Sequence, residues 1–168
     1  MAAQLISTKA RLRRTLFGPR RFAECRVADL DDEPAGFALF FHNYSTFLGR
    51  PGVYLEDLYV PERFRGRGVG IALLRDLARI AVERGCERLD WSVLDWNEPA
   101  LGFYRQIGAR ANRFEDLGID AVDREDHEAR AGPQQALDTL LVNEQAVGDE
   151  SDLDGSPAAP AAVRSAQR

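Results

Sequence analysis

The sequence predicts an α/β (α+β) fold in which helices flank a mixed, mainly antiparallel sheet. Two observations carry this prediction. Three strand-like runs between residues 22 and 60 are separated only by turn residues, which is typical of antiparallel neighbours. A helical segment at 69–85 then separates the third run from a fourth at 88–96, and a strand, a helix and a strand in this order favour a parallel crossover.

The first predicted element is a helix over residues 5–17. Gly18 closes it, because glycine tolerates the left-handed cap, and Pro19 cannot continue a helix. Residues 1–23 contain no acid and several arginines, a composition that also resembles an organelle transit peptide. The apolar spacing suits an ordinary amphipathic helix that leads into a strand, and we favour this interpretation.

An antiparallel hairpin is predicted next. Its strands span residues 22–28 and 36–47, and the turn chemistry of residues 29–36 lies between them. A second turn at 48–52 leads into the third strand at 53–60.

Residues 61–70 form a loop rich in glycine and arginine that leads into the helix at 69–85. The fourth strand spans residues 88–96. A short helix follows at 99–107, with a proline in its first turn and Gly108 as its cap.

The pattern weakens beyond residue 109, so we predict one folded domain over residues 1–110. Residues 111–147 are a poorly defined acidic segment, with a ragged strand or helix at 113–122 and a short amphipathic helix at 134–142. Residues 148–168 are small, polar and acidic and are expected to be a disordered tail, because they cannot bury enough apolar surface to offset their ordering entropy.

Composition excludes several function classes. The chain has 168 residues, a formal net charge of −5 and 45% hydrophobic residues, which fits one core and argues against nonspecific nucleic-acid binding. No apolar run is long enough to span a membrane. Cys25 and Cys86 lie far apart with no histidine at ligand spacing, so neither a disulfide nor a metal site is expected. A reducing cytoplasm is the expected location.

The most informative segment is the loop at the start of the 69–85 helix. Glycines let successive N–H groups converge on one point, and the helix terminus adds partial positive charge there, so a diphosphate fits. An ordinary tight turn before a helix is the alternative interpretation. The loop residues are Arg65, Gly66, Arg67, Gly68, Val69 and Gly70.

Four motifs in order resemble the GNAT acetyltransferases, and within them the branch of spermidine/spermine and thialysine acetyltransferases. The resemblance covers roughly residues 10–110. The motifs are YLEDLYV at 54–60, RGRGVG at 65–70, VLDWNEP at 93–99 and FYRQIGA at 103–109.

This resemblance implies an acetyl-coenzyme A-dependent N-acetyltransferase, with a GNAT-type sheet in which two parallel strands splay apart. The 65–70 loop would hold the coenzyme A pyrophosphate through backbone amides. The strand edge formed by Leu58, Tyr59 and Val60 would pair with the pantetheine arm, and Asn97 would contact the same arm.

Two further residues receive catalytic roles from the resemblance. Tyr104 matches the tyrosine that protonates the departing thiolate, and Glu56 matches the acid that assists loss of the amine proton. Glu56 and Asp57 can both attract a cationic substrate, but as strand neighbours they should point to opposite faces. The alternatives are that both acids make surface hydrogen bonds and that Tyr104 is a core aromatic.

The chain departs from the family at both ends. The usual N-terminal strand and helix and the C-terminal strand pair are not recognisable, so the sheet is expected to be incomplete. An active enzyme acting on a small polyamine-like or amino-acid-like amine is the favoured function. A truncated relative that only binds acetyl-coenzyme A or a partner subunit is the alternative, and a protein acceptor and a homodimer also stay open.

Overall fold

The computed structural model describes residues 7–112, 126–131 and 161–166. Its helices are α1 (Lys9–Phe17), α2 (Val69–Glu83) and α3 (Glu98–Gln106), with one turn of 3-10 helix at Glu62–Phe64. Its strands are β1 (Glu24–Leu30), β2 (Glu33–Ser45), β3 (Arg50–Tyr59), β4 (Leu89–Leu94), β5 (Arg110–Asn112), β6 (Asp126–Ala131) and β7 (Ala162–Ser165).

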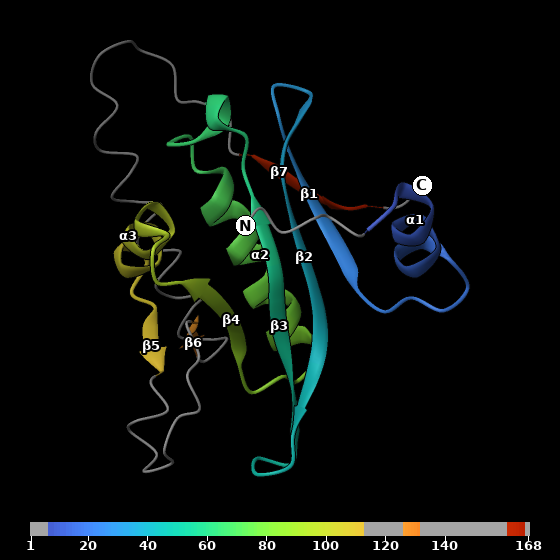
Figure 1. Cartoon of the computed structure of the whole chain (residues 1–168), viewed down its shortest axis with the longest axis vertical. Coiled ribbons are helices and arrows are strands. Elements are labelled where there is room, and N and C mark those ends of the chain that lie inside the picture. The colour runs from blue at the N-terminus through green and yellow to red at the C-terminus, as the bar shows by residue number, and fades with distance from the viewer. Residues whose placement is uncertain (1–6, 113–125, 132–160, 167–168) are drawn as a thin grey trace.

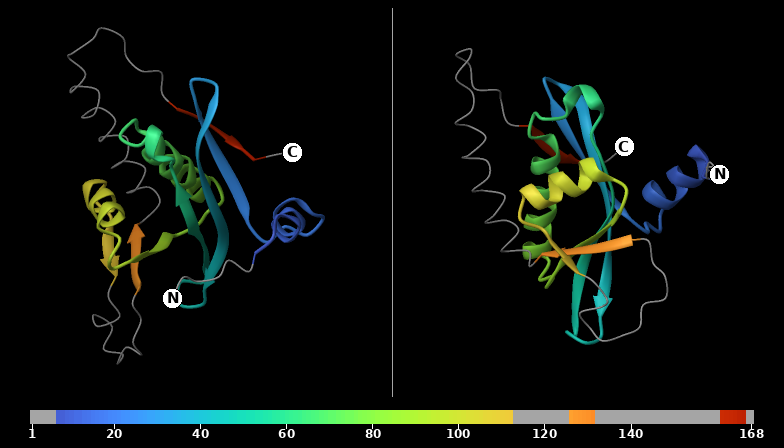
Figure 2. Two further views of the ribbon diagram at one scale, coloured as in Figure 1. Left: turned by 45° about the horizontal axis from the view of Figure 1, so that its top comes forward. Right: turned by 60° about the vertical axis from the view of Figure 1, so that its left-hand side comes forward.

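The described strands form one sheet in the order β5-β6-β4-β3-β2-β1-β7 (Figure 1). Strands β3 and β4 are parallel, and the other neighbouring pairs are antiparallel. This confirms the predicted mixed, mainly antiparallel sheet. Figure 2 shows α2 and α3 on one side of the sheet and α1 on the other.

Helix α1 ends at the predicted place but begins later than residue 5. The Thr8 hydroxyl accepts a hydrogen bond from the Arg11 amide at 3.2 Å, so Thr8 is the N-cap. The helix buries none of its residues. Residues 1–6 of the predicted segment lie outside the described residues.

The hairpin turn between β1 and β2 is much tighter than the predicted turn at 29–36. Asp31 and Asp32 form it alone, with φ values of 54° and 61°. Two successive residues with positive φ give the twist that a two-residue hairpin needs, and aspartate tolerates this conformation better than most residues. Pro34 therefore lies inside β2, opposite Asp29 at an irregularity in the ladder.

Helix α2 packs across β1, β2, β3, β4 and β7 and covers the core. Its apolar residues recur at helical spacing, as predicted from the sequence. The fully buried side chains are large aliphatic and aromatic groups from the helix and from one face of the sheet. Those of greatest volume are Phe40, Leu73, Leu74, Leu77, Leu89, Val53 and Val69.

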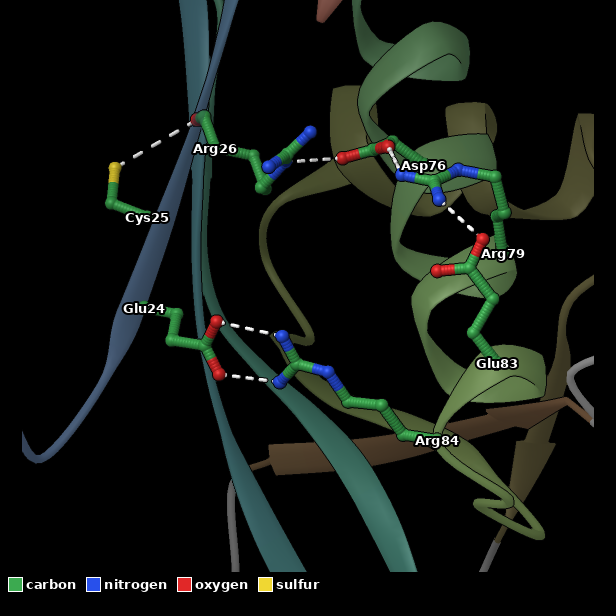
Figure 3. A network of polar contacts seen from close by, with 7 residues as sticks. All are labelled: Glu24, Cys25, Arg26, Asp76, Arg79, Glu83 and Arg84. Carbon is green, nitrogen blue, oxygen red and sulfur yellow. Dashed lines mark hydrogen bonds and ion pairs between the residues drawn. The ribbon is translucent and has the colours of Figure 1, made fainter. Parts of the chain in front are cut away.

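Ion pairs fix the same helix to β1 (Figure 3). The Arg26 guanidinium donates to the buried Asp76 carboxylate at 2.5 Å, and Arg79 donates to the other oxygen of Asp76 at 2.6 Å. Near the C-terminus of α2, Arg84 makes a two-pronged contact with Glu24 of β1, at 2.5 and 2.8 Å. These contacts hold the position of α2 on the sheet, and with it the loop that precedes the helix.

The structure differs from the sequence expectation after α3. Strands β5 and β6 lie within the region where no strand pair is recognisable from the sequence, and β6 pairs with β4 along its whole length. Strand β6 reads DHEARA, without aromatic or β-branched residues, so its propensity gives no strand signal. The elements predicted at 113–122 and 134–142 lie outside the described residues.

Residues 162–165 correct a second expectation. They belong to the predicted disordered tail, but they form β7, which pairs with β1. Arg164 donates to both carboxylate oxygens of Asp29, and Val163 packs against the core. The edge of β1 that faces away from β2 is thereby covered. Residues 148–160 and 167–168 lie outside the described residues.

No helix within the described ranges is long and apolar enough to cross a bilayer. The same ranges contain no group of three or more His, Cys, Asp or Glu side chains that could hold a metal ion.

Candidate functional site

The glycine-rich loop leads directly into the N-terminus of α2. Gly66 and Gly68 have φ values of 72° and 76°, and Gly68 is the N-cap without a side-chain hydrogen bond. A Cβ at either glycine would meet no atom within 4 Å, so the backbone there faces open space. The first amides of the helix lack carbonyl partners within it, and the helix dipole points its positive end the same way. This geometry can receive an anion.

The two arginines of the loop are already engaged by other residues. Arg65 Nε donates to the carbonyl oxygen of Val60 at 3.0 Å, and Arg67 lies 2.8 Å from an Asp31 carboxylate oxygen of the β1–β2 turn. Both side chains hold the loop in place. Backbone amides, more than guanidinium groups, are therefore the donors that the loop offers to a ligand.

Gly70 has a different role from Gly66 and Gly68. A Cβ on Gly70 would lie 3.2 Å from Cζ of Phe103 in α3, closer than ordinary packing allows. The glycine therefore lets α2 approach α3. Sequence analysis placed Gly70 with the phosphate loop, and the structure adds this packing requirement.

Strands β3 and β4 run together for only a short distance. Their register pairs Val53 with Leu89, Tyr54 with Asp90, and Leu55 with Trp91, and no later pair is formed between them in the described residues. On its other side β3 continues to pair with β2 as far as Tyr59. Beyond Leu55, the β4-facing edge of β3 is therefore free to hydrogen-bond an extended ligand.

A β-bulge lies at the same point of β3. Leu55 pairs with Phe40 and Asp57 pairs with Leu39, so Glu56 is the extra residue. Leu55 is in the core and Leu58 packs against it, which leaves Glu56 and Asp57 together on the exposed side. The expectation that these two acids point to opposite faces is wrong, because the bulge interrupts the alternation of side chains.

Tyr104 lies on α3, next to the start of the divergence. Its ring centroid is 5.0 Å from that of Trp91 and 5.2 Å from that of Phe103. Burial raises the pKa of Tyr104 to about 12, because the phenolate would lose hydration. The hydroxyl is therefore a proton or hydrogen-bond donor at any ordinary pH.

Trp91 is 2% exposed, and its indole nitrogen makes no hydrogen bond within the described ranges. An unpaired buried donor costs roughly 1–3 kcal/mol. A ligand carbonyl next to Trp91 would supply the missing acceptor. No signal in the sequence of β4 distinguishes this role of Trp91 from a role in packing alone.

Asn97 and His42 make local hydrogen-bonding contacts. The Asn97 side chain accepts a hydrogen bond from the Ala100 amide at 3.3 Å and caps α3, so the structure gives it a local role. The Nε2 atom of His42 lies 3.3 Å from the Arg84 guanidinium, near the C-terminal end of α2 and away from the glycine loop. Desolvation and the Arg84 charge lower the pKa of His42.

Comparisons with known proteins identify a family model, related sequences and a similar solved structure. Residues 6–109 fit the model of the acetyltransferase (GNAT) family. A thialysine N-epsilon-acetyltransferase of Bos taurus is 35% identical over 118 residues, which cover 66% of this chain and 69% of that protein. An L-ornithine N5-acetyltransferase of Arabidopsis thaliana is 47% identical over 96 residues, or 54% of this chain and 42% of that one. A solved integron cassette protein from the mobile metagenome of V. cholerae gives a TM-score of 0.58 at 28% identity, covering 71% and 74% of the two chains.

Proposed function

Because the chain belongs to the GNAT family of N-acetyltransferases, which use acetyl-coenzyme A, we propose that it acetylates the primary amine of a small polyamine-like or amino-acid-like molecule. The observation that carries this choice of acceptor is the exposed pair Glu56 and Asp57, at the point where β3 and β4 diverge. Two adjacent carboxylates attract a cationic amine. Relatives named for thialysine and L-ornithine acetylation support the same class of acceptor.

In this proposal the backbone amides of residues 66–70 bind the pyrophosphate of acetyl-coenzyme A. The positive φ of Gly66 and Gly68 and the open space beside them support this role. Leu58, Tyr59 and Val60 pair with the pantetheine arm along the edge that β4 leaves, with the Val60 carbonyl already engaged by Arg65. The arm would then lead the thioester toward the divergence of the strands.

Deprotonation of the acceptor is the first requirement of the reaction. An alkyl ammonium has a pKa of about 10.4, so at pH 7 the free amine is disfavoured by about 4.6 kcal/mol. We propose that Glu56 holds the cation and a water molecule that carries the proton away. The exposure of Glu56 supports a role through water.

Acetyl transfer then forms a bond between the amine nitrogen and the acetyl carbon. The carbon–sulfur bond breaks, and its electron pair leaves on sulfur. Tyr104 donates its hydroxyl hydrogen to that thiolate, and the proton that the acylated nitrogen must lose to become an amide returns through water to the Tyr104 oxygen. A pKa of about 12 makes this tyrosine a weak acid, but the apolar surroundings that raise it also raise the pKa of a thiol, so the two groups shift in the same direction.

A catalytically inactive relative that only binds acetyl-coenzyme A or a partner subunit is the second candidate. The observation that favours it is that β5, β6 and β7 lie beyond the residues that match the family, 6–109. Any acceptor contacts from these strands would come from residues outside the part of the chain that matches the family.

A panel of acceptors separates these candidates. Thialysine, L-ornithine, spermidine, a lysine-containing peptide and a peptide with a free N-terminus would each be incubated with acetyl-coenzyme A, and the N-acetylated product measured by mass spectrometry. We expect the small amines to be acetylated faster than either peptide. Binding of acetyl-coenzyme A without any product would favour the inactive relative, and faster acetylation of a peptide would refute the small-amine acceptor.

A further inference from the structure

A hydrogen bond between two hydroxyl groups connects β3 to β4. The Tyr54 hydroxyl oxygen lies 2.6 Å from Oγ of Ser92. One of the two groups donates to the other, so one O–H hydrogen and free lone pairs stay available to a third group. Neither residue was assigned a role from the sequence.

This hydroxyl pair lies where the two strands part. The last paired residues are Leu55 and Trp91, and Ser92 is the next residue along β4. Tyr54 is two residues before Glu56, the extra residue of the bulge. The pair therefore occupies the start of the divergence, the place where the thioester and the incoming amine would meet.

The pair also faces away from the helices. Val53, Leu55 and Trp91 point into the core, so Tyr54 and Ser92 must point to the other face by the alternation of strand side chains. The Tyr54 ring packs against Phe41 in a tilted arrangement, with ring centroids 5.2 Å apart, and Ser92 is exposed.

Tyr104 lies on the helix side of the sheet, in contact with Trp91. The point of divergence thus has a buried hydroxyl on one face and an accessible hydroxyl pair on the other. Glu56 and Asp57 share the accessible face with the pair. An amine drawn to these carboxylates would reach the divergence next to Tyr54 and Ser92.

We propose that the hydroxyls of Tyr54 and Ser92 together accept a hydrogen bond from the acceptor amine and orient its lone pair toward the acetyl carbon. This inference rests on the proposed function. The pair gains and loses no proton, because the amine proton leaves through water near Glu56. Orientation of the nucleophile is a separate contribution from its deprotonation.

A contribution to the stability of the fold does not explain why the Tyr54–Ser92 hydrogen bond lies at this point. Water can replace an exposed hydrogen bond at little cost to the folded state. The neighbouring pairs of β3 and β4 keep the strands together without it.

Three variants test the pair: Tyr54→Phe, which keeps the ring on Phe41, Ser92→Ala, and the double variant. With the best small amine of the panel, each single variant should lower kcat/KM for the amine by about 10- to 100-fold. The KM for acetyl-coenzyme A and the thermal shift that it produces should stay unchanged. The double variant should be little worse than either single one, because the two hydroxyls act as a unit. Ser92→Thr, which retains a hydroxyl, should recover most of the loss.

Tyr44→Phe is the matched control, since Tyr44 is an exposed tyrosine near the far end of the β2–β3 hairpin and should leave all constants unchanged. Unaltered kcat/KM in Tyr54→Phe with an active wild type would overturn this inference alone. Equal losses for the amine and for acetyl-coenzyme A would also overturn it, because the bond would then only set the strand spacing. Absence of turnover in the wild type with every amine would overturn the proposed function together with this inference.

Discussion

The ring of Tyr104 on α3 lies against the ring of Trp91 on β4, with centroids 5.0 Å apart, at the last residue that β4 pairs with β3. The phenol is buried, and the loss of hydration raises the pKa of Tyr104 to about 12. It also fixes a hydroxyl beside the point where the strands diverge. The proposed donor to the leaving thiolate is therefore held by packing, without a hydrogen bond to another side chain among the described contacts.

Replacing Tyr104 by phenylalanine should keep this packing and remove the donor. We expect kcat to fall by about 10²- to 10⁴-fold, or roughly 3 to 5 kcal/mol, with little change in the affinity for coenzyme A. Steady-state kinetics and a coenzyme A titration measure the two quantities, with Tyr44→Phe as the control for loss of a phenol hydroxyl. Turnover close to that of the wild type would leave Tyr104 as a core aromatic.

Gly68→Ala should weaken acetyl-coenzyme A binding through the backbone. An alanine is strained at a φ of 76°, so the apo protein should lose about 1 kcal/mol of stability. The first amides of α2 should also move, so that they no longer converge on one point. Gly49→Ala is a matched control, because Gly49 has a φ of 66° and open space around its Cβ but lies in the β2–β3 turn. Both variants should have a lower melting temperature, and only Gly68→Ala should reduce the thermal shift caused by acetyl-coenzyme A. Equal thermal shifts in the two variants would remove the loop from the binding site.

Deletion of residues 161–168 should destabilise the protein, although sequence composition alone predicts no effect. Without β7, the edge of β1 loses its ladder and Val163 loses its contact with the core. We expect a loss of about 2 kcal/mol, which for a chain of this size lowers the melting temperature by about 4 to 8 °C. Arg164→Ala should have a much smaller effect, because its ion pair with Asp29 is exposed. An unchanged melting temperature after the deletion would show that β7 does not stabilise the sheet.

The Glu24, His42 and Arg84 cluster predicts how stability depends on pH. Burial and the Arg84 charge lower the pKa of His42 below 6.5, so the folded state disfavours its protonation and stability falls as the pH drops below 6.5. The hydrogen bond from Arg84 lowers the pKa of Glu24 below 4.5, so this contribution is complete above 4.5 and is lost as the pH falls through the folded-state value. His42→Asn should reduce the loss of stability below pH 6.5, and Glu24→Gln should reduce the loss below pH 4.5. Urea unfolding at a series of pH values measures both. An identical pH dependence in the wild type and both variants would contradict this account.

Sequence reasoning predicted the glycine-rich loop and the helices beside it because their signals are local, whereas the binding of coenzyme A by this loop stays a prediction. Glycines at 66 and 68 predict a loop with positive φ, and both have it. The helix after the loop and the short helix that carries Tyr104 follow from apolar spacing and from Pro99 and Gly108. Each of these features is decided by residues within one or two turns of the chain.

The features that sequence reasoning missed depend on distant partners. The bulge at Glu56 is a mismatch in register between β3 and β2, and the sequence of β3 alone does not contain it. The β7 strand is held by β1, with Arg164 and Asp29 separated by 135 residues. The Tyr54–Ser92 bond likewise needs the parallel register of two strands that are separated by α2 in the chain.

Acetyl transfer to a small amine as a function of pH tests the central claim most directly, in the wild type and in Glu56→Gln. The wild type should convert thialysine, L-ornithine or spermidine to an N-acetyl product and release coenzyme A. Glu56→Gln should lose most activity near neutral pH and recover part of it as the pH approaches the amine pKa of about 10.4, where free amine is abundant without assistance. No N-acetyl product from the wild type with any of these amines, under conditions where acetyl-coenzyme A binds, would contradict the account.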